Sequence, residues 1–222
     1  MGKEFPASYY DSHFLENRHF QVHYKDSPYY VAWTQVIRFL KRIKPDSILE
    51  IGCGTGQLAE YLRDEGFTNY EGFDFAHEAI NMARKRVNMN FYWGNALDKG
   101  LYRKNFAVVI CLEVLEHIEQ DLQVLENIPP GTEIIFSVPN FDAPSHVRWF
   151  TSPRQLKKRY FRNIDIRDIV PIGNLFICRG TIGKFKPDLM QGLLATREEI
   201  KLASFIARLR HRIKNKLKIK SL

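Results

Sequence analysis

Short apolar runs alternate with helix-like segments along most of this chain. The runs predict strands, and apolar residues spaced three and four positions apart predict the helices between them. The predicted strands lie at about 47–51, 70–74, 90–93, 107–111 and 133–138, and the predicted helices at about 57–65, 77–87, 119–127 and 152–160. This alternation is typical of α/β proteins with a doubly wound, mostly parallel sheet that helices cover on both faces.

Two further apolar runs follow the alternating segment. Residues 164–170 and 174–182 flank the tripeptide Pro171-Ile172-Gly173. Because a short turn that contains glycine joins adjacent strands in antiparallel fashion, we predict a hairpin at one edge of the sheet.

The first 26 residues show little periodicity but are rich in aromatic residues and histidine. Tyr9, Tyr10, Phe14 and Phe20 predict an ordered arm that covers a flat or sugar-like ligand, although the same rings would also suit simple packing. We therefore expect a helical arm or lid at the N-terminal end.

A helix follows the arm. Ser27 suits the N-cap and Pro28 the first helical position, and Pro45 ends the helical pattern. The predicted organisation is an arm and helix at 1–45 on the lid side, a core at 46–185 and a basic amphipathic tail at 186–222.

The size and composition indicate one globular domain. The chain has 222 residues, of which 45% are hydrophobic. No apolar run approaches the roughly 18–20 residues that a membrane span needs. The three cysteines are far apart and odd in number, which favours buried thiols in a reducing compartment. We expect a cytoplasmic protein.

The net charge of +8 is concentrated in the tail. Residues 201–222 hold eight Lys or Arg and no Asp or Glu, so the body of the chain is neutral. A basic amphipathic helix suits an anionic membrane surface, and we expect peripheral association with the inner face of a membrane. Binding to nucleic-acid phosphates and a solvated terminus remain alternatives.

A glycine-rich turn is the first candidate for chemistry. Glu50 ends a predicted strand, and Gly52, Gly54 and Gly56 follow at alternate positions before a predicted helix. Glycines allow a sharp turn and a close approach of a ligand, which then meets the amides of a helix start.

Polar residues at neighbouring strand ends complete a nucleoside-shaped site. Asp74 follows Gly52 by 22 residues and ends the second strand, where a carboxylate accepts from ribose hydroxyls. Asn95 follows the third strand. A dinucleotide site would need its third glycine later than Gly56, at position 57, where this chain has Gln57, which disfavours NAD or FAD.

Together these residues resemble the motifs of class I S-adenosylmethionine (SAM)-dependent methyltransferases. The matching segments are Glu50–Gly56, Gly72-Phe73-Asp74, Gly94–Asp98 and Leu112–Ile118. Ser137–Asn140 and His146–Thr151 resemble the branch of ubiquinone-pathway O-methyltransferases and sugar methyltransferases. The resemblance implies a Rossmann-like seven-stranded sheet of order 3-2-1-4-5-7-6 with an antiparallel last strand.

The resemblance also implies which residues bind SAM. They are Glu50, Gly52, Gly54, Gly56, Asp74, Phe75, Asn95, Ala96 and Leu112. Asn95 stands where the family usually has an Asp that holds the adenine amino group, and an amide oxygen also accepts there. Asn95 would equally suit a turn, and Asp74 would suit a helix cap.

His146 and His117 are the candidate catalytic residues, because a hydroxyl acceptor needs a base. Glu113 and Asn140 are further candidates, and His117 also suits packing at the end of the fourth strand. Methyl transfer itself is an in-line displacement, for which the protein mainly binds and aligns.

Glu113, Glu116, His117 and the later His146 also resemble the metal site of small-RNA 3′-terminal 2′-O-methyltransferases. This chain lacks the further histidines of those enzymes beside the second ligand. We therefore assign no metal ligand, and the binding of a divalent ion stays open.

The sequence thus favours an enzyme that methylates a small-molecule or glycan acceptor. An RNA or protein methyltransferase that uses the tail to grip its substrate is one alternative. A non-catalytic module that binds SAM or S-adenosylhomocysteine (SAH) is another. The oligomeric state cannot be read from the sequence.

Overall fold

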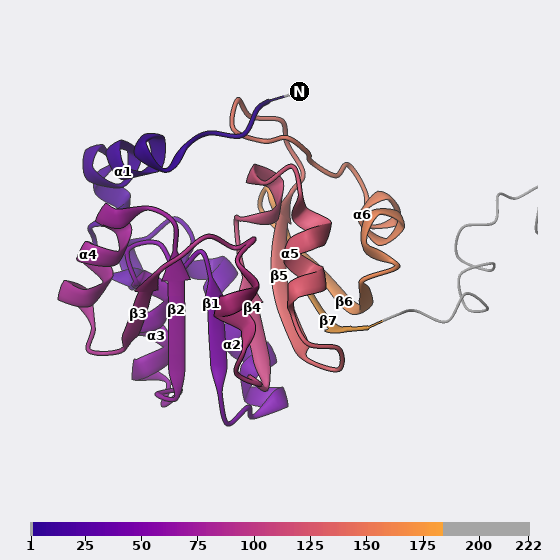
Figure 1. The fold of residues 1–222 in the computed structure, drawn as a ribbon, viewed down its shortest axis with the longest axis horizontal. Coiled ribbons are helices and arrows are strands. Elements are labelled where there is room, and N and C mark those ends of the chain that lie inside the picture. Colours follow the sequence, from indigo (N-terminus) through magenta and orange to yellow (C-terminus); the bar gives the residue numbers. More distant parts are fainter. Residues whose placement is uncertain (1, 184–222) are drawn as a thin grey trace, which may run out of the picture. The chain divides into compact units, whose positions relative to one another are not determined.

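The computed structural model describes residues 2–183, whose strands and helices are drawn in Figure 1. The strands are β1 (Ile48–Ile51), β2 (Tyr70–Asp74), β3 (Asn90–Trp93), β4 (Val108–Cys111), β5 (Glu133–Pro139), β6 (Ile164–Ile172) and β7 (Leu175–Ile182). They form one seven-stranded sheet of order β3-β2-β1-β4-β5-β7-β6, in which β7 runs antiparallel to both neighbours. The predicted fold class, strand order and edge hairpin are confirmed.

Helices cover both faces of the sheet. They are α1 (Ala7–Glu16), α2 (Tyr30–Ile43), α3 (Gln57–Asp64), α4 (His77–Arg86), α5 (Asp121–Asn127) and α6 (Pro153–Tyr160). β1 and β4 are buried along their whole length, as expected for central parallel strands. β3 at the edge is exposed at three of its four positions.

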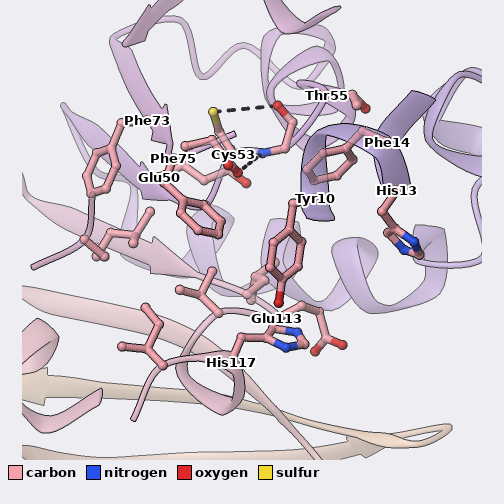
Figure 2. A pocket seen from close by; sticks show the side chains of 18 of the residues that line it. Tyr10, His13, Phe14, Glu50, Cys53, Thr55, Phe73, Phe75, Glu113 and His117 are labelled. Carbon is pink, nitrogen blue, oxygen red and sulfur yellow. Dashed lines mark hydrogen bonds between the residues drawn. The ribbon is translucent and has the colours of Figure 1, made fainter. Parts of the chain in front are cut away.

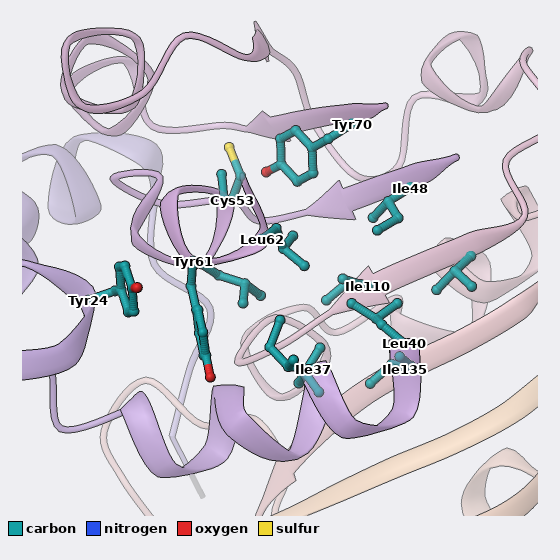
Figure 3. Close-up of a cluster of buried hydrophobic side chains, with 14 of the residues drawn as sticks. Tyr24, Ile37, Leu40, Ile48, Cys53, Tyr61, Leu62, Tyr70, Ile110 and Ile135 are labelled. Carbon is teal, nitrogen blue, oxygen red and sulfur yellow. The ribbon is translucent and has the colours of Figure 1, made fainter. Parts of the chain in front are cut away.

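Each face of the sheet has its own hydrophobic core. On one face Ile37 and Leu40 of α2 pack against Ile110 of β4, as Figure 3 shows. On the other face Leu125 of α5 packs with Phe136 of β5 in a second cluster. Alternate residues of the central strands contribute their side chains to the two cores, because successive side chains of a strand point to opposite faces.

The strand order reverses between β1 and β4, which are neighbours although β2 and β3 intervene in the chain. At such a switch point the connections leave in opposite directions, so a crevice opens beyond the carboxyl ends of these strands. The glycine turn after β1 and the segment after β4 both begin at this edge of the sheet.

Two predicted helix starts were wrong by a few residues. Ser27 accepts a hydrogen bond from the Tyr29 amide at 3.3 Å, but α2 begins at Tyr30. The short 3₁₀ turn at Tyr24–Asp26 occupies the chain before it. α5 begins at Asp121, two residues later than expected.

The arm contains α1, which lies above α4 in Figure 1. No residue of α1 is fully buried, so its own periodicity is weak. No helix within residues 2–183 is long and apolar enough to span a membrane. The predicted basic tail at 186–222 lies outside the described residues.

Candidate cofactor and acceptor site

A cavity of about 350 Å³ lies at the carboxyl ends of β1, β2 and β4, beneath the N-terminal arm. Of the predicted site residues, Glu50, Gly52, Gly54, Asp74, Phe75, Asn95, Ala96, Leu112, His117 and His146 line it. Gly56 and Asn140 are not among its lining residues. The cavity therefore brings together eight of the nine predicted cofactor residues and both candidate catalytic histidines.

All three glycines of the turn have positive φ values, of 70°, 51° and 76°. Gly54 lines the cavity, and a Cβ there would lie 3.6 Å from the Phe14 ring of the arm. Gly56 lies behind the turn, where a Cβ would approach the Ala83 Cβ of α4 to 3.0 Å. Gly54 thus keeps the ligand space open, whereas Gly56 allows the turn to pack against α4.

Asp74 ties the end of β2 to the glycine turn. Its Oδ2 accepts from the Gly54 amide at 3.0 Å, and its Oδ1 accepts from the Ala76 amide at 2.9 Å. Burial raises the pKa of Asp74 to about 6. Each carboxylate oxygen has a second lone pair, so Asp74 caps the following segment and can still accept from a ligand.

Asn95 serves in a turn and also faces the cavity. Its Oδ1 accepts from the Leu97 amide at 2.9 Å, which makes it a turn residue. The side chain is exposed and lines the cavity. Glu50 is buried beneath the turn, accepts from the Tyr70 hydroxyl and has a pKa raised to about 8 by burial.

Glu113 has an unusual backbone conformation. It lies in the half of the cavity that also contains His117 and His146, which we call the acceptor end. Its φ of 55° lies in the left-handed region, which costs a non-glycine residue on the order of 1–3 kcal/mol. Ser137 holds this conformation, because its Oγ accepts from the Glu113 amide at 2.8 Å and donates to Glu113 Oε1 at 2.6 Å. Burial raises the pKa of Glu113 well above its usual range.

The rings of His117 and His146 lie with centroids 5.1 Å apart. Nδ1 of His117 faces the Ser145 carbonyl at 2.9 Å, and Nδ1 of His146 faces the Phe141 carbonyl at 3.2 Å. A carbonyl can only accept, so each Nδ1 carries the proton and each Nε2 is left as an acceptor. Burial lowers the pKa of both rings, which favours the neutral form of a general base.

The Glu116 carboxylate lies beside the two imidazoles and makes a third candidate metal ligand. One ligand atom from each of Glu116, His117 and His146 lies within 4.8 Å of the others. Glu116 is fully buried, and neither of its carboxylate oxygens has a hydrogen-bond partner within residues 2–183. Two imidazoles and a carboxylate suit a divalent transition metal, so these residues fit the cation that the resemblance raised.

The arm also contributes residues to the half of the cavity that contains the glycine turn and Asp74, which we call the cofactor end. The sequence did not indicate this contribution. Figure 2 shows Phe14 and Tyr10 of α1 beside Cys53 and Phe75, in the half of the cavity that holds the glycine turn. The aromatic content of the arm predicted a lid, but nothing in the sequence placed it over the glycine turn.

The end of the arm is anchored to that turn by main-chain carbonyls. Thr55 Oγ1 donates to the Phe20 carbonyl at 2.7 Å, and Gln57 Nε2 donates to the Val22 carbonyl at 2.9 Å. Arg86 at the end of α4 donates to the carbonyls of Phe20, Val22 and Thr55, each at 2.9 Å. Arg86 carries no motif, so no sequence signal pointed to this role.

The fold and this cavity define a Rossmann-like nucleoside-cofactor domain of the class I methyltransferase type. Residues 23–171 match the family model described as "Methyltransferase domain", so the chain belongs to the methyltransferase-domain family. This match confirms the resemblance inferred from the motifs.

Among curated proteins, the ubiquinone biosynthesis O-methyltransferase of Hydrogenovibrio crunogenus is 28% identical over 124 residues. The match covers 50% of this chain and 51% of that protein, so the chain spans about half the length of this relative.

Two solved structures share the fold. The PH0226 protein of Pyrococcus horikoshii has a TM-score of 0.61 at 16% identity, over 78% of this chain and 99% of that one. The N-methyltransferase NodS of Bradyrhizobium japonicum, in complex with SAH, has a TM-score of 0.57 at 18% identity, over 78% and 91%. At these identities the likeness concerns the fold alone.

Proposed function

We propose that this protein transfers the methyl group of SAM to a hydroxyl group of a small-molecule or glycan acceptor. The observation that carries the proposal is the single cavity, with the glycine turn and Asp74 at one end and His117 and His146 at the other. The name of the relative from H. crunogenus, an O-methyltransferase, supports a hydroxyl acceptor.

The residues at the cofactor end suit SAM, which supplies an activated methyl group when bound. Asp74 would accept from the ribose hydroxyls, and Asn95 would accept from the adenine amino group. Gly54 leaves room for the backbone to approach the cofactor. Phe14 of the arm would close over the same region and exclude water.

The residues at the acceptor end suit deprotonation of a hydroxyl. Transfer from a sulfonium requires the acceptor oxygen to lie in line with the methyl group, which the walls of the cavity would enforce. Nε2 of His146 or His117 would take the hydroxyl proton as a general base.

A divalent cation is a second way to activate the hydroxyl. Glu116, His117 and His146 would hold it, and its charge would lower the pKa of an acceptor hydroxyl. Turnover by metal-free protein that no cation improves would assign the proton to an imidazole alone. Loss of turnover on chelation, restored by one added cation, would assign the cluster as a metal site.

The test is a screen for SAH release with the full chain across catechols, saccharides, RNA and peptides. SAM binding is measured separately by native mass spectrometry and calorimetry. We expect SAM to bind and a hydroxyl-bearing small molecule or saccharide to release SAH. SAM binding without turnover of any acceptor would favour the non-catalytic module, and turnover of RNA or peptide alone would favour the other alternative. Absence of SAM and SAH binding would contradict the proposal.

The basic tail supports a separate proposal about location, peripheral binding to an anionic membrane from the cytoplasmic side. Binding to anionic vesicles at low salt, lost when the chain is truncated after about residue 200, is the expected result. Binding to RNA but not to vesicles would contradict it.

A further inference from the structure

Two adjacent tyrosines of α1 have different surroundings. Tyr9 is 40% exposed and stacks on Phe5 with ring centroids 4.2 Å apart. The Tyr10 ring lies 5.2 Å from that of Phe75 and meets His117 edge-on at 5.8 Å. Tyr10 therefore bridges the cofactor end and the acceptor end of the cavity.

The Tyr10 hydroxyl is buried and has no hydrogen-bond partner within residues 2–183. Buried hydroxyls in native proteins nearly always have a partner, so one that lines a cavity indicates a ligand. A tyrosine hydroxyl is protonated near neutral pH, so Tyr10 can donate a hydrogen bond to a ligand.

Acceptor groups face this donor. Figure 2 shows the Tyr10 hydroxyl directed toward His117 and Glu113, and both of those residues line the cavity. Nδ1 of His117 faces the Ser145 carbonyl, so its proton lies there and Nε2 is left as an acceptor. A ligand group at this point must therefore accept from Tyr10 and donate to the opposite wall, and a hydroxyl does both.

We propose that Tyr10 binds the acceptor hydroxyl directly and orients it for methylation, which makes the site selective for hydroxyl acceptors. This inference rests on the proposed function. One lone pair of the acceptor oxygen accepts from Tyr10, and another attacks the SAM methyl carbon as its bond to sulfur breaks. The hydroxyl proton passes to an imidazole Nε2, and the sulfur keeps the bonding electrons as SAH leaves.

The anchors of the arm determine where Tyr10 stands. At one end the Gly2 amide donates to the His146 carbonyl and the Lys3 amide to the Pro144 carbonyl, both at 3.0 Å. Next to Tyr10, Asp11 Oδ1 accepts from the Glu78 amide of α4 at 2.8 Å. Acceptor recognition is therefore coupled to a closed arm.

The test compares Tyr10→Phe with the control Tyr92→Phe, in the full chain and with an acceptor identified by SAH release. Tyr92 is 42% exposed on the edge strand β3 and does not line the cavity. Tyr10→Phe keeps the ring but removes the hydroxyl. We expect kcat/KM for the acceptor to fall about tenfold or more, as loss of one hydrogen bond predicts. The Kd for SAM and the melting temperature should match those of Tyr92→Phe.

A second measurement compares kcat/KM for a hydroxyl acceptor with kcat/KM for its thiol analogue. The wild-type protein should prefer a hydroxyl acceptor to its thiol analogue, which is a weaker hydrogen-bond acceptor, and Tyr10→Phe should narrow that preference. Equal kinetics for the two variants would overturn the inference and leave the proposed function intact. A weaker Kd for SAM in Tyr10→Phe alone would also overturn it, because Tyr10 would then serve the cofactor. A wild-type protein that methylates no hydroxyl would overturn both.

Discussion

The two ends of the cavity are built in different ways. The cofactor end comes from three successive strand ends, and its key groups are held by main-chain amides, as in the bonds from Gly54 and Ala76 to Asp74. The acceptor end comes from segments far apart in the chain, α1, the end of β4 and the loop after β5. Proteins of one fold can share a cofactor and still act on different acceptors. The cofactor end is therefore built from the sheet, whereas the acceptor end is built from segments that can vary more freely.

The largest effect should come from the acceptor end. His146→Ala removes a candidate base and one member of the Glu116 cluster, so kcat should fall about 10²–10³-fold. The Kd for SAM should change little, because the cofactor end stays intact. His77→Ala is the control, since His77 is exposed and stacks on Trp93. An unchanged kcat in steady-state assays would show that His146 is not the general base.

A substitution at the cofactor end should weaken SAM binding rather than lower kcat. Asp74→Ala removes the carboxylate that holds the Gly54 amide and would accept from the ribose, so calorimetry should show SAM binding weakened about 100-fold. Glu71→Ala is the control on the same strand, because Glu71 pairs with Lys104 away from the cavity. Equal affinities for the two variants would contradict the assigned role of Asp74.

The arm joins the two ends, and Arg86 tests that connection. Arg86→Met removes three hydrogen bonds to carbonyls and the ion pair with Glu60, so unfolding should cost about 2 kcal/mol less. Protease should also cut faster near residues 18–22. Arg84→Met, which loses one bond to the Phe91 carbonyl, should have a smaller effect on both measurements.

The smallest expected effect is a pH dependence confined to the cofactor end. The pKa of Asp74 is raised to about 6 in the free protein. In the proposed function, the ionised form would accept from the ribose hydroxyls of SAM. SAM affinity should therefore be constant above pH 7 and fall as the pH drops through 6, by about tenfold at pH 5. Calorimetry across this range measures it. Affinity that rises on acidification would contradict the sign.

The predictable part of the molecule is the part where local pattern and tertiary position coincide. β1 and β4 are buried on both faces, so their apolar runs stand out in the sequence. The glycine turn and Asp74 are identifiable because their spacing follows from one strand–helix–strand unit. The start of α2 was predicted two residues too early, since Ser27 and Pro28 form a turn before the helix rather than its first residues.

The unpredictable part depends on contacts between distant segments. The arm was expected over the acceptor, and the sequence did not indicate that it also reaches the cofactor end, where Phe14 lies over Gly54. Gly56 was expected to bind the cofactor, but it contacts α4 and does not line the cavity. Arg86 belongs to no motif, although it holds three carbonyls of the arm and the turn.

The sequence by itself determined the order of strands and helices, the family, and the positions of the glycine turn and Asp74 at the cofactor end. These properties depend on periodicity and on short spacings, which a chain carries locally. Only the tertiary structure decided that Tyr10, His117 and His146 share one cavity and that Glu116 is buried beside the imidazoles without a partner. The physical reason is that burial and hydrogen-bond satisfaction depend on segments more than 100 residues apart in the chain.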